Sequence, residues 1–205
     1  MIKAGIDEAG RGSLISRVYT AITILPDNFL DMCQEENIVI RDSKKMTQLQ
    51  REKSRLFIEK HAIDYNVQWS EVEEIDGIGI QKATMKAMHR CIDALHMFPD
   101  KLYVDGDYYE NHIPELQYEC VIRGDDIIPE IACASILAKT YRDEYIENLC
   151  KTHSDILEPY GILQNKGYGT KIHMDALRQF GFTDFHRKSF CKQSYSLFQK
   201  KRILL

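Results

Sequence analysis

Three short apolar stretches of this chain each lead into carboxylates, and this pattern restricts the possible folds most strongly. The stretches and their acids are residues 2–6 with Asp7 and Glu8, residues 102–104 with Asp105, and residues 116–122 with Asp125. Short apolar runs bounded by turn residues are typical of strands. If the three strands end at the same edge of one sheet, acids that are distant in sequence meet in space. Neighbouring residues of a strand point to opposite faces, so Asp7 and Glu8 share a site only if their strand ends there.

The rest of the chain predicts a single α/β unit in which helices flank a mixed sheet. Further strands are expected over residues 18–25 and 63–69, and helices over 47–61, 75–95, 129–149 and 175–180. Leu49, Leu56, Phe57 and Ile58 are the expected apolar stripe of the first helix. Pro129 suits the first turn of the third helix, whose small alanines indicate close packing on the sheet. We expect one domain over residues 1–205, with a helical, basic C-terminal part from about residue 171.

Composition excludes several other classes of protein. The chain has 205 residues, 44% of them hydrophobic and 28% charged, which is usual for a globular domain. It has no apolar run long enough to cross a membrane and no signal peptide, so we expect a soluble cytoplasmic protein. The six cysteines form no C-x-x-C pair, which favours reduced, buried thiols over a zinc or redox motif.

The net charge of −4 gives no global indication of a nucleic-acid partner, but the C-terminal end is basic. No acid follows Asp184, whereas the basic residues there are Arg187, Lys188, Lys192, Lys200, Lys201 and Arg202. This end is either merely solvated or follows a phosphate backbone.

Asp7, Glu8, Asp105 and Asp125 would repel one another if they converged, and a divalent cation would relieve that repulsion. Oxygen ligands without histidine or cysteine favour Mg²⁺ or Mn²⁺ over zinc. Any one of these acids taken alone is better explained as a solvated turn residue. The convergence of three segments is what favours a metal site.

The order and spacing of several motifs make the chain resemble the type 2 ribonucleases H, or ribonuclease HII, over nearly its whole length. The motifs are GIDEAGRG at 5–12, RDSKKMT at 41–47, VDG at 104–106, RGD at 123–125, PEIACASILAKTYRD at 129–143, NKGYGT at 165–170 and HRKSF at 186–190. Ribonuclease HIII fits less well, because that family lacks this Gly-Arg-Gly. VDG alone would be uninformative, and RGD as an adhesion motif is a false lead in a chain without a signal peptide.

The resemblance implies a ribonuclease H-like fold and an endoribonuclease that removes ribonucleotides during DNA replication and repair. The expected reaction is hydrolysis of the phosphodiester 5′ to a ribonucleotide, in an RNA–DNA hybrid or at a single ribonucleotide in duplex DNA, leaving a 3′-hydroxyl and a 5′-phosphate. Asp7, Glu8, Asp105 and Asp125 match the family's catalytic metal ligands. They would hold two Mg²⁺ or Mn²⁺ ions about 4 Å apart.

The resemblance also indicates substrate-binding residues. A glycine-rich turn lets main-chain groups approach a sugar closely, so Gly10, Arg11 and Gly12 are expected to read the 2′-hydroxyl. Tyr168 matches the tyrosine that packs at the RNA–DNA junction, although an aromatic ring there could simply hold the loop to the core. Lys44 and Lys45 are candidate phosphate contacts or solvated surface lysines, with Ser43 or Thr47 capping the next helix.

Two other groups of residues have structural explanations. Lys139, Arg142 and Asp143 resemble the family's A-K-x-x-R-D helix and are expected to form a salt bridge. His186 could be sought as a general acid or base, but a lone histidine is more often structural.

The chain departs from the family after Gly12, where Ser13-Leu14-Ile15-Ser16-Arg17 stands in place of Pro-Leu-Ala-Gly-Pro. This loss of two prolines and a glycine changes the backbone restriction near the sugar-reading turn. Gly79 replaces a common asparagine, and Asp107 adds an acid near Asp105. Two alternatives therefore stay open: a nuclease that needs several consecutive ribonucleotides, and a non-catalytic nucleic-acid binding module. The second should have lost at least one of the four carboxylates, and all four are present.

Overall fold

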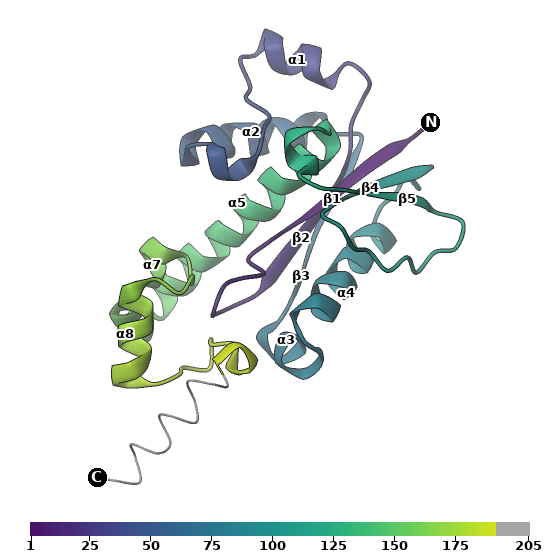
Figure 1. Cartoon of the computed structure of the whole chain (residues 1–205). Helices are drawn as coiled ribbons and strands as arrows, with labels where there is room; N and C mark the ends of the chain where they lie inside the picture. The colour runs from purple at the N-terminus through teal and green to yellow at the C-terminus, as the bar shows by residue number, and fades with distance from the viewer. Residues whose placement is uncertain (192–205) are drawn as a thin grey trace.

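A five-stranded mixed sheet forms the centre of the molecule in the computed structural model, which describes residues 1–191 (Figure 1). The strands are β1 (Lys3–Ala9), β2 (Val18–Ile24), β3 (Asp64–Ser70), β4 (Lys101–Asp105) and β5 (Gln117–Val121), in the order β3-β2-β1-β4-β5. β1 runs antiparallel to β2 and parallel to β4, and β4 runs parallel to β5. This arrangement confirms the predicted mixed sheet and puts β1 beside β4.

One long helix covers each face of the sheet. Ala4 and Ile6 of β1 pack into one buried cluster with Met85 and Met88 of α4 (Ile80–Asp93). The alternate residue Gly5 faces α5 (Pro129–Thr152), where an added Cβ would lie 2.3 Å from the backbone of Glu130. The small residues expected in this helix therefore accompany a close approach of its backbone to β1.

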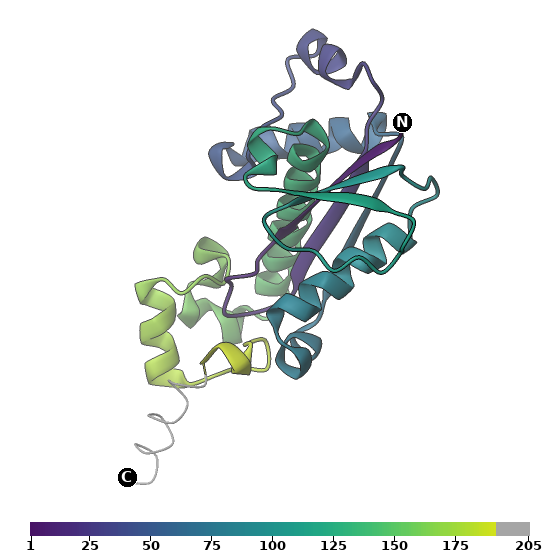
Figure 2. The ribbon, with the colours of Figure 1, turned by 45° about the vertical axis from the view of Figure 1, so that its right-hand side comes forward.

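The remaining helices lie around this core. They are α1 (Phe29–Glu35), α2 (Gln48–His61), α3 (Val72–Ile78), α6 (Ser154–Leu157), α7 (Ile162–Asn165) and α8 (Lys171–Phe180), with short 3₁₀ turns η1 (Ser43–Lys45), η2 (Gly124–Asp126), η3 (Glu158–Tyr160) and η4 (Lys188–Cys191). Figure 2 shows the C-terminal helices gathered beyond one end of the sheet, away from α1 and α2. There Ile15, Leu157 and Ile162 share a second buried cluster.

Two predictions about helices were wrong in part. The helix expected over 75–95 is interrupted at Gly79, whose φ of 85° ends α3 and begins α4, since a positive φ does not continue a helix. Leu49 and Leu56 are 76% and 68% exposed, because α2 buries a different face that contains Ser54, Phe57 and Ile58. The Thr47 side chain does cap α2, through a capping box with Gln50.

Some predictions concern residues beyond the described range. Lys192, Lys200, Lys201 and Arg202 of the basic end lie outside the described residues. Within residues 1–191, Cys33, Cys91, Cys120, Cys133 and Cys150 are free thiols. No helix in this part of the chain is long and apolar enough to cross a membrane.

Candidate active site

Asp7 and Glu8 lie inside β1, in register with Ala21 and Thr20 of β2, so the expectation that the strand ends before them is wrong. The two side chains consequently leave the sheet on opposite faces. Asp7 is buried towards α5, where it contacts the Ser135 hydroxyl, and Glu8 lines a small cavity with Thr84 of α4. The two carboxylates nevertheless act on each other, because the charge of Glu8 contributes to a raised pKa at Asp7.

Asp105 is a third carboxylate that acts on both of them. It ends β4, directly beside β1, and its Oδ1 accepts a hydrogen bond of 2.8 Å from the backbone N–H of Gly124. This bond holds η2, and with it Asp125, next to the end of β4. The charge of Asp105 contributes to a raised pKa at Asp7, Glu8 and Asp125 alike. The structure thus brings all four sequence-predicted carboxylates into one electrostatically connected group.

Burial is the main reason why these carboxyl groups resist ionisation. It raises the pKa of Asp7 well above the ordinary value, and the charges of Glu8 and Asp105 raise it further. Burial also raises the pKa of Glu8, although Arg11, 3.1 Å away, opposes this shift. The pKa of Asp125 is raised by burial and then by Asp105. A cation at this site would lower all three pKa values.

The donor set fits a hard divalent cation that keeps part of its water shell. In the described part of the chain, no three His, Cys, Asp or Glu side chains form a ready-made metal-binding group. Mg²⁺ does not require such a group, because it commonly binds through one or two carboxylates and retains several waters. Asp7, Glu8, Asp105 and Asp125 offer only hard oxygen ligands, which suit this mode of binding.

The two lysines of the DSKK motif have different surroundings. The charges of Asp7 and Asp125 raise the pKa of Lys44, although its partial burial opposes the shift. Lys45 instead forms an ion pair of 2.7 Å with Asp126, the residue after Asp125, and lies 3.5 Å from Asp42. Lys44 therefore borders the acids directly, whereas Lys45 connects η1 to η2. The contacts of Asp42 and Asp126 with Lys45 were not predicted from the sequence.

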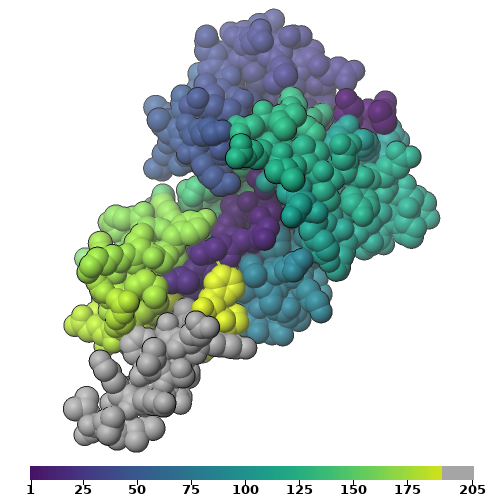
Figure 3. Space-filling model, viewed as in Figure 1, coloured from purple at the N-terminus to yellow at the C-terminus, as the bar shows by residue number. Residues whose placement is uncertain are grey.

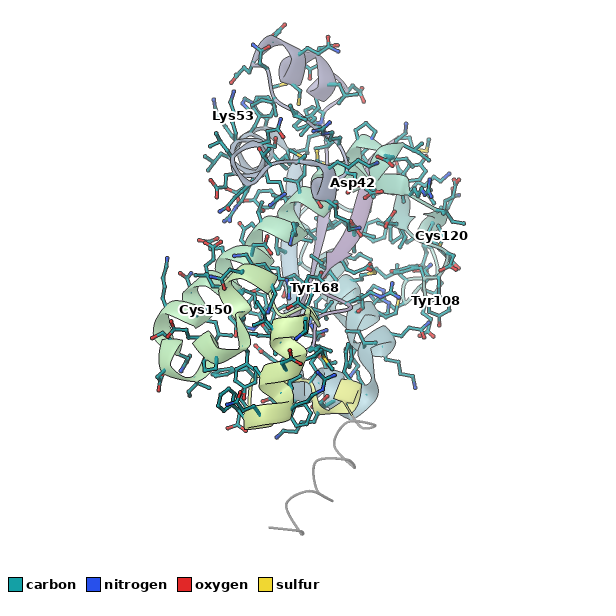
Figure 4. The ribbon with its side chains drawn as sticks, turned by 60° about the vertical axis from the view of Figure 1, so that its left-hand side comes forward. Asp42, Lys53, Tyr108, Cys120, Cys150 and Tyr168 are labelled. Carbon is teal, nitrogen blue, oxygen red and sulfur yellow. The ribbon has the colours of Figure 1, made fainter. Side chains whose placement is uncertain are left out.

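Residues 10–16, here called the recognition loop, connect β1 to β2 between a buried arginine and an aromatic ring. Gly10 has a φ of 92°, and an added Cβ would lie 2.1 Å from Nε of Arg142, so this position requires glycine. An added Cβ on Gly12 would lie 3.8 Å from the Tyr168 ring. Tyr168 is 40% exposed, and Figure 4 shows it where the sheet meets the C-terminal helices. Its ring can therefore meet a ligand that touches the loop.

The buried side chain of Arg187 holds this loop from behind, which sequence analysis missed by grouping Arg187 with the basic end. Its Nη1 donates to the carbonyls of Gly10, Arg11 and Ser13 at 2.8, 3.0 and 2.8 Å, and its Nε donates to Ser16 at 2.8 Å. Within residues 1–191, the N–H groups of Arg11 and Gly12 donate to no protein atom. The loop thus turns carbonyls inward and leaves amide donors for a ligand. The place of Arg187 inside the HRKSF motif, rather than in the basic end that follows it, was the available signal.

The other candidate residues form contacts within the protein that support its structure. Lys139 and Asp143 form the expected ion pair at 2.9 Å, whereas Arg142 is fully buried and donates to the Lys166 carbonyl at 2.7 Å. His186 is also fully buried, with its Nε2 3.1 Å from Nε2 of His173. This histidine pair lies among the C-terminal helices, as expected for a structural role.

The recognition loop and the end of β1 are accessible from one side of the molecule. Figure 3 shows the purple N-terminal segment at the floor of a hollow, between the green C-terminal helices and the teal segment around β5. A ligand placed in this hollow would reach both the loop and the acidic edge of the sheet.

Comparison with known proteins agrees with this geometry. The sequence model of the family described as Ribonuclease HII matches residues 4–193. The ribonuclease HII of Parabacteroides distasonis is 43% identical over 189 residues, which are 92% of this chain and 89% of that protein. The chain belongs to the ribonuclease HII family. Members of this family are ribonucleases H, so the protein is an endonuclease and a hydrolase.

Solved structures of related proteins have the same fold. The ribonuclease H2 of Pyrococcus horikoshii OT3 superimposes with a TM-score of 0.78 at 23% identity, covering 98% of this chain and 99% of that one. A structure of Bst-RNase HIII in complex with Mn²⁺ has a TM-score of 0.67 at 17% identity, covering 88% of this chain and 63% of that chain. The mixed sheet with flanking helices is therefore the fold of the ribonuclease HII family and its structural relatives.

Proposed function

We propose that this protein hydrolyses the phosphodiester on the 5′ side of a ribonucleotide, in RNA–DNA hybrids and at single ribonucleotides embedded in duplex DNA, leaving a 3′-hydroxyl and a 5′-phosphate. The observation that supports this most directly is the place of Asp105. It links Asp7 and Glu8 of β1 with Asp125 of η2, next to a loop whose amide groups are free.

Asp7, Glu8, Asp105 and Asp125 would hold two divalent ions, Mg²⁺ or Mn²⁺, in this proposal. The Mn²⁺ complex of Bst-RNase HIII, which shares the fold, supports the choice of a divalent metal. When bound, such ions supply Lewis-acid stabilisation of the phosphate and lower the pKa of a water molecule. The carboxylates position this chemistry and form no bond to the substrate.

Residues of the chain would place the substrate around that centre. The free N–H groups of Arg11 and Gly12 can donate to the 2′-hydroxyl oxygen, which distinguishes ribose from deoxyribose. Tyr168, beside Gly12, can stack against the neighbouring sugar or base. Lys44 can neutralise a phosphate oxygen near Asp7 and Asp125.

The test is cleavage of an end-labelled DNA duplex that contains one ribonucleotide, with Mg²⁺, with Mn²⁺ and with a chelator. An all-DNA duplex is the negative control, and a chimera with four consecutive ribonucleotides is the second substrate. A metal-dependent cut 5′ to the single ribonucleotide supports the proposal. Cleavage of the chimera alone would instead indicate a nuclease for RNA–DNA hybrids, and binding without any cleavage would indicate a binding module.

A further inference from the structure

The last residue of the recognition loop, Ser16, has a backbone conformation that a serine does not favour. Ser16 has a φ of 67°, in the left-handed region, although it carries a Cβ. Its N–H donates to the Phe185 carbonyl at 2.8 Å, and its own carbonyl accepts from Arg187 at 2.8 Å. Such a conformation persists only where the surroundings hold it. The next residue, Arg17, supplies a further restraint.

Arg17 is held by one carboxylate and two aromatic rings. Its Nε and Nη2 lie 2.9 and 2.6 Å from the two carboxylate oxygens of Glu71, which is a bidentate ion pair. The guanidinium carbon lies 4.8 Å from the ring centre of Trp69 and 4.1 Å from that of Tyr145. Trp69 also donates from Nε1 to Glu71 at 2.9 Å, so the carboxylate is itself fixed.

These partners come from three different elements. Trp69 lies on β3, Glu71 is the N-cap residue of α3, and Tyr145 lies on α5. Although burial opposes the shift, hydrogen bonds to Glu71 and Tyr19 raise the pKa of Arg17, so the group is charged throughout the accessible pH range. The end of the recognition loop is therefore attached to both the sheet and the long helix.

We propose that Arg17 is a positioning residue that fixes the recognition loop and so sets how strictly the site selects a single ribonucleotide. This inference rests on the proposed function. In the family pattern, a glycine and a proline stand where this chain has Ser16 and Arg17. The proline ring restricts its own backbone, whereas here the Glu71 ion pair and the stacked rings restrict the chain through a side chain.

The experiment compares Arg17→Ala with Arg55→Ala, a matched control. Arg55 of α2 also stacks on a tyrosine of α5, with its guanidinium carbon 3.8 Å from the Tyr141 ring, and it pairs with Glu59 and Glu144, but it does not touch the loop. The readout is the ratio of kcat/KM for the single-ribonucleotide duplex to kcat/KM for the four-ribonucleotide chimera. A small displacement of the substrate from the catalytic groups lowers the reaction rate strongly. Arg17→Ala should therefore lower this ratio roughly tenfold or more. Arg55→Ala should leave it unchanged.

A rescue variant separates loop positioning from general stability. The double substitution Ser16→Gly with Arg17→Pro restores backbone restriction without the ion pair, because glycine adopts the positive φ of position 16 without strain and proline fixes the φ of position 17. It should return the ratio to within about threefold of the wild type. Arg17→Lys keeps the charge but not the bidentate geometry, and should lie between the alanine variant and the wild type.

Three outcomes would overturn the inference. An unchanged ratio in Arg17→Ala shows that the loop is placed without the Arg17 ion pair and its stacked rings. Equal loss on both substrates, with failure of the rescue variant, shows that Arg17 only stabilises the fold. A wild-type protein that cuts neither substrate overturns the proposed function and the role of Arg17 with it, which distinguishes that failure from the other two.

Discussion

The Nη1 atom of Arg187 lies 2.8 Å from the carbonyl oxygen of Gly10, although 177 residues separate the two in the sequence. Through this contact, a C-terminal segment determines the shape of a loop that follows the first strand. The backbone of the two segments is also paired, because the N–H of Arg187 donates to the Leu14 carbonyl at 2.8 Å. The site is thus assembled from both ends of the described chain.

Arg187→Met should destabilise the protein and impair the recognition loop. The methionine would leave the buried carbonyls of Ser13 and Ser16 without their donor, and unsatisfied buried groups cost about 1–3 kcal/mol each. We expect urea unfolding to show a loss of at least about 2 kcal/mol. The control Arg178→Met removes an exposed pair with Asp175 and should change little. Equal stability of the two variants would contradict this role for Arg187.

Asp7→Asn should abolish cleavage and yet stabilise the metal-free protein at neutral pH. Loss of a metal ligand should lower activity by about 100-fold or more. The folded-state pKa of Asp7 is raised above the unfolded value, so ionisation of Asp7 destabilises the fold as pH rises through the folded-state pKa. Thermal unfolding in chelator should therefore show a higher Tm for the variant at pH 7, with the difference vanishing below the ordinary aspartate pKa.

The exposed Asp27 provides the comparison for that experiment. Asp27→Asn removes one surface carboxylate just beyond the end of β2 that pairs with the start of β1, and should alter neither the activity nor the Tm appreciably. Retention of most of the cleavage activity by Asp7→Asn would exclude its assignment as a metal ligand.

The His173–His186 pair should make the C-terminal helices sensitive to acid. Burial, and then the charge of His173, lowers the pKa of His186 to about 3. Because this value lies below the unfolded-state pKa of about 6.5, the stabilisation is complete above pH 6.5 and is lost as pH falls from 6.5 towards 3. His186→Gln should reduce the difference in unfolding free energy between pH 7 and pH 5. The exposed His96→Gln should preserve that difference.

Tyr168→Ala should weaken cleavage at a single ribonucleotide more than cleavage within a ribonucleotide run. The ring lies beside Gly12 of the recognition loop, so its loss affects recognition of one sugar most strongly when no neighbouring ribonucleotide can compensate. We expect a reduction of roughly tenfold in kcat/KM on the single-ribonucleotide duplex, the value of one lost stacking contact. Tyr168→Phe keeps the ring and should retain most of the activity. An equal loss on both substrates would make Tyr168 a structural residue.

The elements of the fold were predictable where local chemistry decides them. Alternating or continuous apolar runs placed all five strands, and Pro129 marked the start of the long helix correctly. Local pattern was less informative for helices with few buried residues. It missed α1, and it placed Leu49 and Leu56 on the buried face of α2, because which face of a helix is covered depends on the neighbour that packs against it.

The family, the mixed sheet and the identity of the four acids were predictable from the sequence, since motif order and strand patterning are properties of the chain. That β1 continues past Asp7 and Glu8, and that Asp105 acts on both, follows from the fold, because strand pairing extends β1 along β2 and places β4 beside it. The contacts of Arg17 and Arg187 likewise appear only in the folded structure. Both side chains act on the recognition loop through partners distant in sequence, and no local spacing encodes those contacts.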